Sequence, residues 1–380
     1  MKPVLLRLKA NWEPHELKPV LEALRREEVV IAPTDTVYGL LAPAFSPAAF
    51  AALDSIKGNR ESPYALVFDS VAGFKKWYGE LNPFRRRTLE ELLPGPATVV
   101  LPAPPFLSTN FRYESGRIAV RVCSDRLFPE LARQLGKPLW ATSANRTGAP
   151  APTEFQRVDP ALVTQVSLSV DLGATIYRQP STVVDLTRLP FKVIREGAGL
   201  ERCAAVLGTA HRPLHILVVC TGNVCRSPLM AATIAHLVGE AGASGIRVAS
   251  AGIRASPGYP ATPDMVDIAA GWGVDLTGHQ AVQITPEMLI GSDLILAAEP
   301  EHRDFISALV PEVSDRVRLA GEPVGLAEIP DPFGISRDFY LQTAGLIRNV
   351  SQGWADSLRA AAEEVGWQPS LQPQTADRFA

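Results

Sequence analysis

The chain has 380 residues, is 46% hydrophobic and 20% charged, and carries a formal net charge of −3, a balance ordinary for a soluble globular protein. No apolar run is long enough for a transmembrane helix, and residues 1–9 lack the apolar core of a signal peptide. Four cysteines in a chain of this length exclude a disulfide framework.

Charge is distributed unevenly along the chain. Residues 1–208 carry 26 lysines and arginines against 21 aspartates and glutamates, whereas residues 209–380 carry 11 against 19. A mildly basic first half fits an anionic partner such as a nucleotide or RNA. Three consecutive arginines at 85–87 are typical of a solvated helix face.

The length predicts two domains, with room for a third. Turn-forming residues at 208–213 follow a short helical run and precede a new strand, so we place the boundary there. The expected domains are 1–208 and 209–366. The tail at 367–380 is rich in proline and glutamine, and we expect it to be disordered.

The first half alternates between helical and strand patterns. An amphipathic helix is predicted at 17–28 and a second helix at 47–56. Strands are predicted at 29–32, 65–68, 99–101, 117–122, 138–141, 181–185 and 193–195. This alternation predicts an α/β fold with a mixed or parallel sheet.

Cationic and hydroxyl side chains follow several of these elements, where α/β sheets place their ligands. We expect them to surround one crevice that suits an anionic ligand of nucleotide type: Thr34, Lys57, Arg60, Arg121, Ser143, Asn145, Ser181 and Arg195.

The motifs around these residues resemble the Sua5/YrdC family of threonylcarbamoyl-AMP synthases over about residues 10–200. The matching segments are 33–40 (PTDTVYGL), 94–98 (PGPAT), 117–122 (RIAVRV), 142–145 (TSAN), 181–185 (STVVD) and 195–198 (REGA). The resemblance implies a domain with a twisted mixed sheet that condenses L-threonine, bicarbonate and ATP, with Mg²⁺ on the phosphates. The product serves t6A modification of tRNA, so the modification machinery and tRNA are implied partners.

Roles for individual residues follow from the same resemblance. Thr34 and Tyr38 would contact threonine, and Arg121 belongs to the threonine and ATP site. Lys57, Arg60 and Arg195 would hold phosphates and carboxylate, whereas Ser143, Asn145 and Ser181 would lie beside the carbamate and nucleotide. No metal site made of protein ligands alone is expected. The family usually has Lys-x-Arg after the second helix, but Lys57 and Arg60 are separated by one residue more, which places Arg60 off the family position.

Residues 220–228 read Cys-Thr-Gly-Asn-Val-Cys-Arg-Ser-Pro and follow the apolar run at 216–219. This pattern predicts a strand, a tight loop and a helix whose positive end faces the loop. Backbone N–H groups between Cys220 and Arg226 can surround one anion, and Arg226 can bind two phosphate oxygens. The positive surroundings favour the Cys220 thiolate, so the loop predicts a phosphatase that acts through a phosphocysteine.

This half resembles the low-molecular-weight protein tyrosine phosphatases from about residue 215 to 358. The resemblance implies a Rossmann-like domain with a four-stranded parallel sheet, no cofactor, and a phosphorylated protein as substrate. Asp331, in Asp-Pro-Phe-Gly, would be the general acid and Phe333 a wall of the substrate site. The phosphate loop and its support would comprise Thr221, Gly222, Asn223, Val224, Cys225, Ser227, Ser250 and His279. By the same resemblance, Ser227 would donate to the thiolate.

Two features of this half bear on substrate and regulation. Residues 255–263 resemble the bacterial branch that includes protein arginine phosphatases, but that branch has threonine where this chain has Val224. The substrate class, tyrosine or arginine, stays open on this ground. Cys225 could form a reversible disulfide with Cys220 under oxidant.

Three interpretations compete. The first, which we prefer, is a bifunctional fusion of synthase and phosphatase. The second keeps the phosphatase and makes the first half a non-catalytic nucleotide- or RNA-binding module. The third makes the second half a thiol-based reductase, for instance of arsenate, although a reductase would not need Asp331. A reactive thiol with no disulfide framework indicates the reducing cytoplasm, with no membrane partner.

Overall fold

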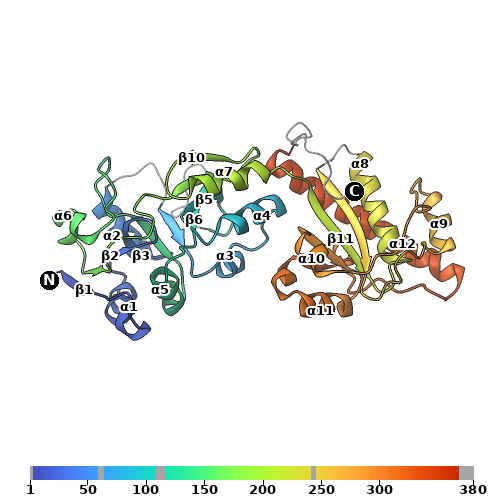
Figure 1. Ribbon diagram of the computed structural model, residues 1–380, viewed down its shortest axis with the longest axis horizontal. Coiled ribbons are helices and arrows are strands. Elements are labelled where there is room, and N and C mark those ends of the chain that lie inside the picture. The colour runs from blue at the N-terminus through green and yellow to red at the C-terminus, as the bar shows by residue number, and fades with distance from the viewer. Residues whose placement is uncertain (1–2, 59–63, 108–115, 241–244, 368–380) are drawn as a thin grey trace. The chain divides into compact units, whose positions relative to one another are not determined.

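The computed structural model describes residues 3–58, 64–107, 116–240 and 245–367 (Figure 1). The chain divides into two compact units, Met1–Ala210 and His211–Ala380, which are described separately. The predicted disordered tail lies outside the described residues, apart from Trp367.

The first unit is built on one mixed sheet, which among the described residues has ten strands in the order β1-β8-β2-β3-β7-β4-β6-β5-β9-β10. The strands are β1 (Val4–Arg7), β2 (Val30–Pro33), β3 (Tyr38–Pro43), β4 (Ala65–Val67), β5 (Ala97–Pro102), β6 (Arg117–Arg121), β7 (Leu139–Ser143), β8 (Leu168–Asp171), β9 (Thr182–Asp185) and β10 (Lys192–Arg195). The sheet contains parallel pairs such as β5 with β9 and antiparallel pairs such as β2 with β3, so it is mixed, as predicted.

Helices connect these strands: α1 (Lys18–Arg25), α2 (Pro47–Lys57), α3 (Val71–Tyr78), α4 (Pro83–Leu92), α5 (Leu127–Leu135), α6 (Pro160–Val163) and α7 (Leu200–Thr209), with short 3₁₀ turns at Pro14–Leu17 and Phe155–Arg157. Local chemistry sets where they begin. At α2 the Ser46 hydroxyl accepts from Ala49 N at 3.1 Å and Pro47 occupies the first turn, which explains why the helix predicted at 47–56 is found almost unchanged.

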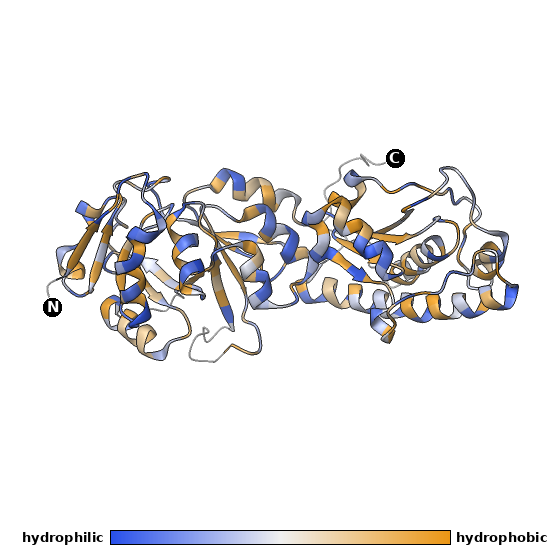
Figure 2. Cartoon of the chain, turned by 90° about the horizontal axis from the view of Figure 1, so that it is seen from below, coloured by the Kyte–Doolittle hydropathy of each residue, from blue (hydrophilic) through white to orange (hydrophobic). Residues whose placement is uncertain are grey.

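One hydrophobic core of this unit lies between the sheet and the pair α1 and α5. Leu24 of α1 and Phe128 of α5 are fully buried in one cluster with strand residues such as Leu41, Leu139 and Val170. Figure 2 shows hydrophobic and polar residues alternating along the helices, which is the pattern of elements with one face in a core.

The prediction that the arginines at 85–87 form a solvated face is wrong for two of them. Arg85 and Arg87 are only 3% and 6% exposed. Arg85 donates to Leu186 O and Thr187 O at 2.9 and 2.7 Å, and Arg87 donates to Ala210 O at 2.7 Å. Because α4 packs against α7, these guanidinium groups satisfy carbonyls at the ends of β9 and α7 rather than facing water.

The second unit is built on a sheet whose described strands are all parallel, in the order β12-β11-β13-β14: β11 (Leu214–Cys220), β12 (Ile246–Gly252), β13 (Leu294–Ala297) and β14 (Val317–Leu319). Its helices are α8 (Arg226–Glu240), α9 (Pro263–Ala270), α10 (Pro286–Ile290), α11 (Pro300–Leu309) and α12 (Arg337–Val365), with 3₁₀ turns at Pro311–Arg316 and Glu322–Val324. The predicted α/β class and parallel four-stranded sheet are confirmed.

Strand periodicity divides the core of this unit between the two faces of the sheet. Leu217 and Val219 of β11 join a cluster with α10 and α11, and α8 packs against α12 on the other face (Figure 1). Since the strands are parallel, their carboxyl ends meet at one edge. The loop after Cys220 begins at that edge, which is where a parallel sheet offers a ligand site.

No helix within the described ranges is both long and apolar enough to cross a bilayer.

Candidate active sites

The loop between β11 and α8 surrounds the Cys220 thiol. Cys220 is 2% exposed, and its Sγ lies 3.0 Å from Ser227 Oγ and accepts from Asn223 N at 3.3 Å. Asn223 has a left-handed backbone (φ 55°), a conformation that asparagine tolerates better than most residues. The loop therefore folds back so that donors converge on the sulfur.

Asn223 is the centre of the supporting network. Its Nδ2 donates to Ser227 Oγ at 2.9 Å and to Ser250 Oγ at 2.8 Å, and its Oδ1 accepts from Val282 N at 2.8 Å. His279 Nε2 lies 2.7 Å from Asn223 O. The structure thus brings together the four residues that the sequence grouped by resemblance alone.

Gly252, at the end of β12, permits this close packing. A Cβ atom at this position would lie 2.6 Å from Thr221 O and 2.9 Å from Asn223 N. Any larger residue would displace the loop, because the atoms in the way are backbone.

Arg226 is 1% exposed and is fixed through both terminal nitrogens. Nη1 donates to Glu299 Oε2 and Ile329 O at 3.0 and 3.1 Å. Nη2 donates to Asp331 Oδ2 and Thr221 Oγ1 at 2.7 and 3.1 Å. Nε has no partner among the described residues, although it is buried. A buried N–H without an acceptor is costly, and an anion in the loop would supply one.

Backbone donors lie around the same space. In the described part of the chain, the N–H groups of Gly222, Val224 and Cys225 have no hydrogen-bond acceptor. Together with Arg226 Nε and the start of α8, they form an unsatisfied set of donors that suits one oxyanion.

Asp331 and Phe333 lie in a turn beside this loop. Asp331 Oδ1 accepts from Phe333 N at 3.2 Å, while Oδ2 accepts from Arg226. Phe333 is 62% exposed, so its ring is free to contact a substrate.

Cys225 points away from the solvent. It is 3% exposed, and its Sγ lies 3.5 Å from Thr262 Oγ1 and 3.7 Å from Tyr340 OH. Burial raises the pKa of its thiol, so Cys225 is a poor nucleophile in this state.

Sequence reasoning missed two residues of this site, Glu299 and His302. Glu299 follows β13, the neighbour of β11 in the parallel sheet, and its carboxylate binds Arg226. His302 is fully buried, and its Nε2 lies 3.0 Å from Thr221 Oγ1. The rule that ligand groups follow adjacent parallel strands could have found Glu299.

In the first unit, Lys57 holds the segment that follows β7. It is 8% exposed, and its Nζ donates to Ser143 O, Asn145 O and Asn145 Oδ1 at 2.7, 2.5 and 3.0 Å. Ser143 Oγ donates to Asn145 Oδ1 at 2.5 Å. The ammonium thus organises the Ser143–Asn145 turn, instead of extending into open space as a phosphate ligand would. Arg60 lies outside the described residues.

The hydroxyl groups of Thr34 and Tyr38 serve the fold in this state. Thr34 Oγ1 donates to Val37 O at 2.8 Å and accepts from two backbone N–H groups in the same turn. Tyr38 is fully buried and donates to Gly173 O at 2.7 Å, and burial raises its pKa to about 12. A ligand would have to contact other atoms of these residues or replace these bonds.

Arg121, at the end of β6, belongs to a second cluster. Its Nη2 donates to the fully buried carboxylate of Asp35 at 2.5 Å, and its Nη1 donates to Thr36 Oγ1 at 3.0 Å. Asp35 also accepts from Ser124 N at 3.0 Å. The motif at 33–40 therefore supplies a carboxylate that positions Arg121, a role that we did not predict.

Arg195 and Ser181 form a third cluster. Arg195 Nη2 donates to Ser181 O and Oγ at 2.7 and 3.0 Å, and Ser181 Oγ lies 2.8 Å from Thr98 Oγ1. This cluster unites the PGPAT and STVVD segments with β10.

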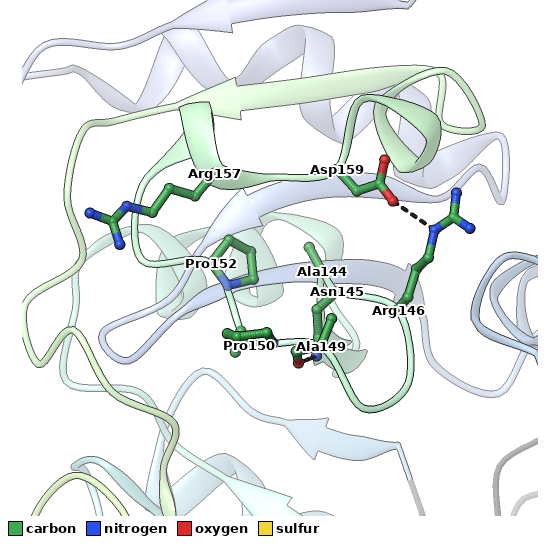
Figure 3. Close-up of a pocket in the computed structure, with 9 residues that line it drawn as sticks. Ala144, Asn145, Arg146, Ala149, Pro150, Pro152, Arg157 and Asp159 are labelled. Atoms are coloured by element: carbon green, nitrogen blue, oxygen red, sulfur yellow. Dashed lines mark hydrogen bonds and ion pairs between the residues drawn. The ribbon is translucent and has the colours of Figure 1, made fainter.

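Hydrogen bonds group the predicted residues that the structure describes into these three clusters, and Thr34 joins the second one, because its Oγ1 lies 2.9 Å from Thr36 Oγ1. In the sheet, Arg121 on β6 pairs with Val67 on β4, which pairs in turn with Leu139 on β7. Leu139 lies four residues before Ser143 on the same strand. A pocket of about 320 Å³ adjoins the first cluster and contains only Asn145 of the predicted residues. Figure 3 shows Arg157 on one side of it and the Arg146–Asp159 ion pair, 2.6 Å long, on the other. Pro150 and Pro152 line its inner surface.

One group of potential metal ligands occurs among the described residues. One ligand atom each from Asp35, Cys123 and Asp125 lies within 4.8 Å of the others. The Arg121 guanidinium already neutralises Asp35 there, which opposes a cation, and we assign no metal to it.

Comparison with known proteins agrees with this division of the chain. Residues 22–197 match the Sua5/YciO/YrdC family model, described as "Telomere recombination", and residues 215–364 match the model of low molecular weight phosphotyrosine protein phosphatases. The chain therefore joins a member of the Sua5/YrdC family to a member of the low-molecular-weight phosphatase family.

Individual relatives match one half each. The low molecular weight protein-tyrosine-phosphatase Etp of Escherichia coli K12 is 40% identical over 143 residues, which is 38% of this chain and 93% of that protein. A putative threonylcarbamoyl-AMP synthase of Mycobacterium tuberculosis H37Rv is 32% identical over 188 residues, 49% of this chain and 86% of that protein. The solved YwlE arginine phosphatase of Geobacillus stearothermophilus is 29% identical over 40% of this chain and 97% of its own, with a TM-score of 0.37.

Proposed function

We propose that residues 211–367 form a protein phosphatase in which Cys220 is the nucleophile, Arg226 binds the phosphoryl group and Asp331 is the general acid. The observation that carries this proposal is the set of unsatisfied donors around Cys220, formed by the loop N–H groups and Arg226 Nε. Such donors suit the charge that develops on the equatorial oxygens of a phosphoryl group in transfer.

The reaction would proceed in two displacements. Cys220 Sγ attacks phosphorus and the bond to the leaving oxygen breaks, while Asp331 gives that oxygen a proton. The Asp331 carboxylate then takes a proton from water, whose oxygen attacks phosphorus. The S–P bond breaks, which releases inorganic phosphate and regenerates the thiolate, stabilised by Ser227. No cofactor takes part.

Phosphotyrosine is the substrate class that we favour over phosphoarginine. Val224 offers no hydroxyl to a guanidinium N–H, and an exposed aromatic ring, Phe333, lies beside the general acid, where it could stack on a phenyl ring. The relative Etp is itself named a protein-tyrosine phosphatase.

The test is hydrolysis of phosphotyrosine and phosphoarginine peptides by the full chain. We expect Cys220→Ser to abolish turnover and Cys225→Ser to retain it, because only Cys220 faces the donors. Turnover by Cys220→Ser at a rate near that of the wild type would contradict the phosphocysteine mechanism and favour a different nucleophile.

We further propose that residues 1–210 synthesise threonylcarbamoyl-adenylate from L-threonine, bicarbonate and ATP for t6A modification of tRNA. The supporting observation is the pocket beside Asn145, whose turn is organised by the buried Lys57. ATP would arrive with Mg²⁺, and catalysis would consist of positioning and charge neutralisation by the chain. We place both activities in the cytoplasm, where the tRNA machinery is found and thiols stay reduced.

Pyrophosphate release distinguishes this proposal from its alternative. The full chain should release pyrophosphate from ATP only when threonine and bicarbonate are both present, because the adenylate cannot form before the carbamate. Binding of ATP without threonine-dependent pyrophosphate release would favour a non-catalytic nucleotide-binding module. For the second half, arsenate reduction that survives Asp331→Asn would favour a reductase.

A further inference from the structure

The fully buried His302 contacts two of the groups that hold Arg226, Thr221 and Glu299. Its Nε2 is 3.0 Å from Thr221 Oγ1 and 3.2 Å from Glu299 Oε1. Thr221 Oγ1 accepts from Arg226 Nη2, and Glu299 Oε2 accepts from Arg226 Nη1. One ring nitrogen therefore bridges two of the four acceptors of the guanidinium, one at each terminal nitrogen.

The surroundings determine which ring nitrogen carries the proton. Nδ1 has no partner among the described residues, so a proton there would be a buried donor without an acceptor. Without a proton, Nε2 would place its lone pair 3.2 Å from the negatively charged Glu299 Oε1, and the two would repel each other. A proton on Nε2 satisfies Glu299 and Thr221 together, which favours the Nε2–H tautomer.

The charge state of the ring agrees with this arrangement. Burial, and after it the nearby Arg226 cation, lower the pKa of His302 to about 4. A neutral ring adds no second positive charge that would compete with Arg226 for the phosphate. Three other charged groups lie near it: Asp331, which binds Arg226, and the exposed pair Arg254 and Glu301, which form an ion pair of 3.3 Å.

We propose that His302 is a positioning residue for Arg226. Its Nε2–H hydrogen-bonds to Thr221 and Glu299 and so fixes the distance between these two acceptors. Because they bind the two terminal nitrogens of Arg226, this distance orients the guanidinium with its Nε toward the phosphoryl group. The proposal rests on the phosphatase function proposed above. In this tautomer Nε2 donates to Thr221 Oγ1 and cannot accept from it. The hydroxyl hydrogen of Thr221 is therefore available to a phosphate oxygen.

Two substitutions at His302 separate the hydrogen bond from the volume. His302→Leu keeps the ring position filled but removes the donor, whereas His302→Gln places an amide N–H near the position of Nε2. His236→Leu on α8, half-buried in the same unit, is the matched control. The readouts are the affinity of the full chain for inorganic phosphate by calorimetry and kcat/KM for aryl phosphates.

We expect His302→Leu to weaken phosphate binding and kcat/KM by roughly tenfold or more, as for a lost hydrogen bond to a charged network. The loss should be equal for good and poor leaving groups, because Arg226 acts on the phosphoryl group. His302→Gln should recover most of it. Thr221→Val should cause a similar loss, and the double variant should lose little more than either single one, because both act through Arg226.

Wild-type phosphate affinity in His302→Leu would overturn the proposal. The proposal would also be overturned if the losses of phosphate affinity in the two single variants multiplied in the double variant. It would be overturned equally if His302→Gln bound phosphate as weakly as His302→Leu. Either result would indicate that His302 serves core packing. Hydrolysis of aryl phosphates by the wild-type chain would still support the phosphatase function, whatever the result for the His302 variants. Absence of hydrolysis by the wild type would overturn the proposed function itself.

Discussion

Arg226 Nη2 donates to Asp331 Oδ2 across 2.7 Å, so the group assigned to phosphate binding and the group assigned to proton transfer are in direct contact. The arginine is almost fully buried, whereas the carboxylate side chain is 42% exposed. A phosphoryl group entering the loop would compete for this guanidinium and release Asp331 toward the leaving oxygen. With the roles proposed above, the pair would couple substrate binding to the position of the acid.

Asp331→Asn should slow hydrolysis of poor leaving groups by about two to four orders of magnitude, the usual contribution of a general acid. Binding of inorganic phosphate should change little, because Arg226 and the loop N–H groups remain. Steady-state kinetics across a series of aryl phosphates measures this, and the loss should shrink as the leaving group improves. A small, uniform loss would mean that Asp331 merely shapes its turn.

Gly252→Ala should abolish phosphate binding while the sheet remains intact. The added methyl group would lie 2.6 Å from Thr221 O, and it must push the loop away from Cys220. The control is Gly239→Ala in α8, where a Cβ meets no atom within 4 Å and where helix propensity predicts a small gain in stability. Calorimetry with inorganic phosphate compares the two, and equal affinities would show that the loop can yield at this point.

Mild peroxide should inactivate the phosphatase reversibly through a disulfide between Cys220 and Cys225. The buried, protonated Cys225 would act as the resolving thiol after Cys220 is oxidised to the sulfenic acid. Peptide mass spectrometry should show the linked pair, and thiol reductant should restore activity. In Cys225→Ser the same treatment should be irreversible. Over-oxidation of Cys220 in the wild type would argue against protection.

Asp125 should make the first unit less stable as pH rises. Burial raises the pKa of Asp125 to about 6, above its ordinary value of 3.8, so the folded state retains a proton that the unfolded state has lost. The contribution of Asp125 to the free energy of unfolding is therefore fully present below about pH 4. It decreases as the pH rises to about 6, by at most about 3 kcal/mol. Asp125→Asn should flatten this slope and still cap α5, since Oδ1 accepts from Leu127 N and Phe128 N at 2.8 and 3.0 Å. Hydrogen exchange of the α5 amides between pH 4 and 7 measures the effect, and an unchanged slope would contradict it.

Lys57→Met should impair both the stability of the first unit and pyrophosphate release. It removes the donor that joins three oxygen acceptors of the Ser143–Asn145 turn. Ser143 O and Asn145 Oδ1 keep Asn145 N and Ser143 Oγ as donors, whereas Asn145 O loses the ammonium, at a cost of about 1–3 kcal/mol for a buried group left unpaired. Lys76→Met, on an exposed position of α3, is the control. Loss of synthesis at unchanged stability would instead indicate that Lys57 contacts the substrate directly.

Much of the phosphatase site could be predicted from the sequence. Cys220, Asn223, Arg226 and Ser227 lie within eight consecutive residues, and a loop between a strand and a helix restricts their geometry through local backbone chemistry. Their supporters at Ser250 and His279, and the acid at Asp331, were recognisable by family motifs, and the structure brings all three to the loop. Glu299 and His302 carry no motif of that kind, because their meaning depends on which strand lies next to β11.

In the first unit, the sequence by itself determined the α/β class, seven of the ten strands that the structure describes and the polar segments that follow them; β1, β3 and β8 were not predicted. Only the tertiary structure decided what those polar groups do. Lys57, Tyr38 and Arg85 read as surface or ligand-binding groups, but packing buries them, and a buried donor must find an acceptor within the fold. Which acceptor it finds depends on residues such as Asn145, Gly173 and Leu186, which lie far away along the chain and next to it in space.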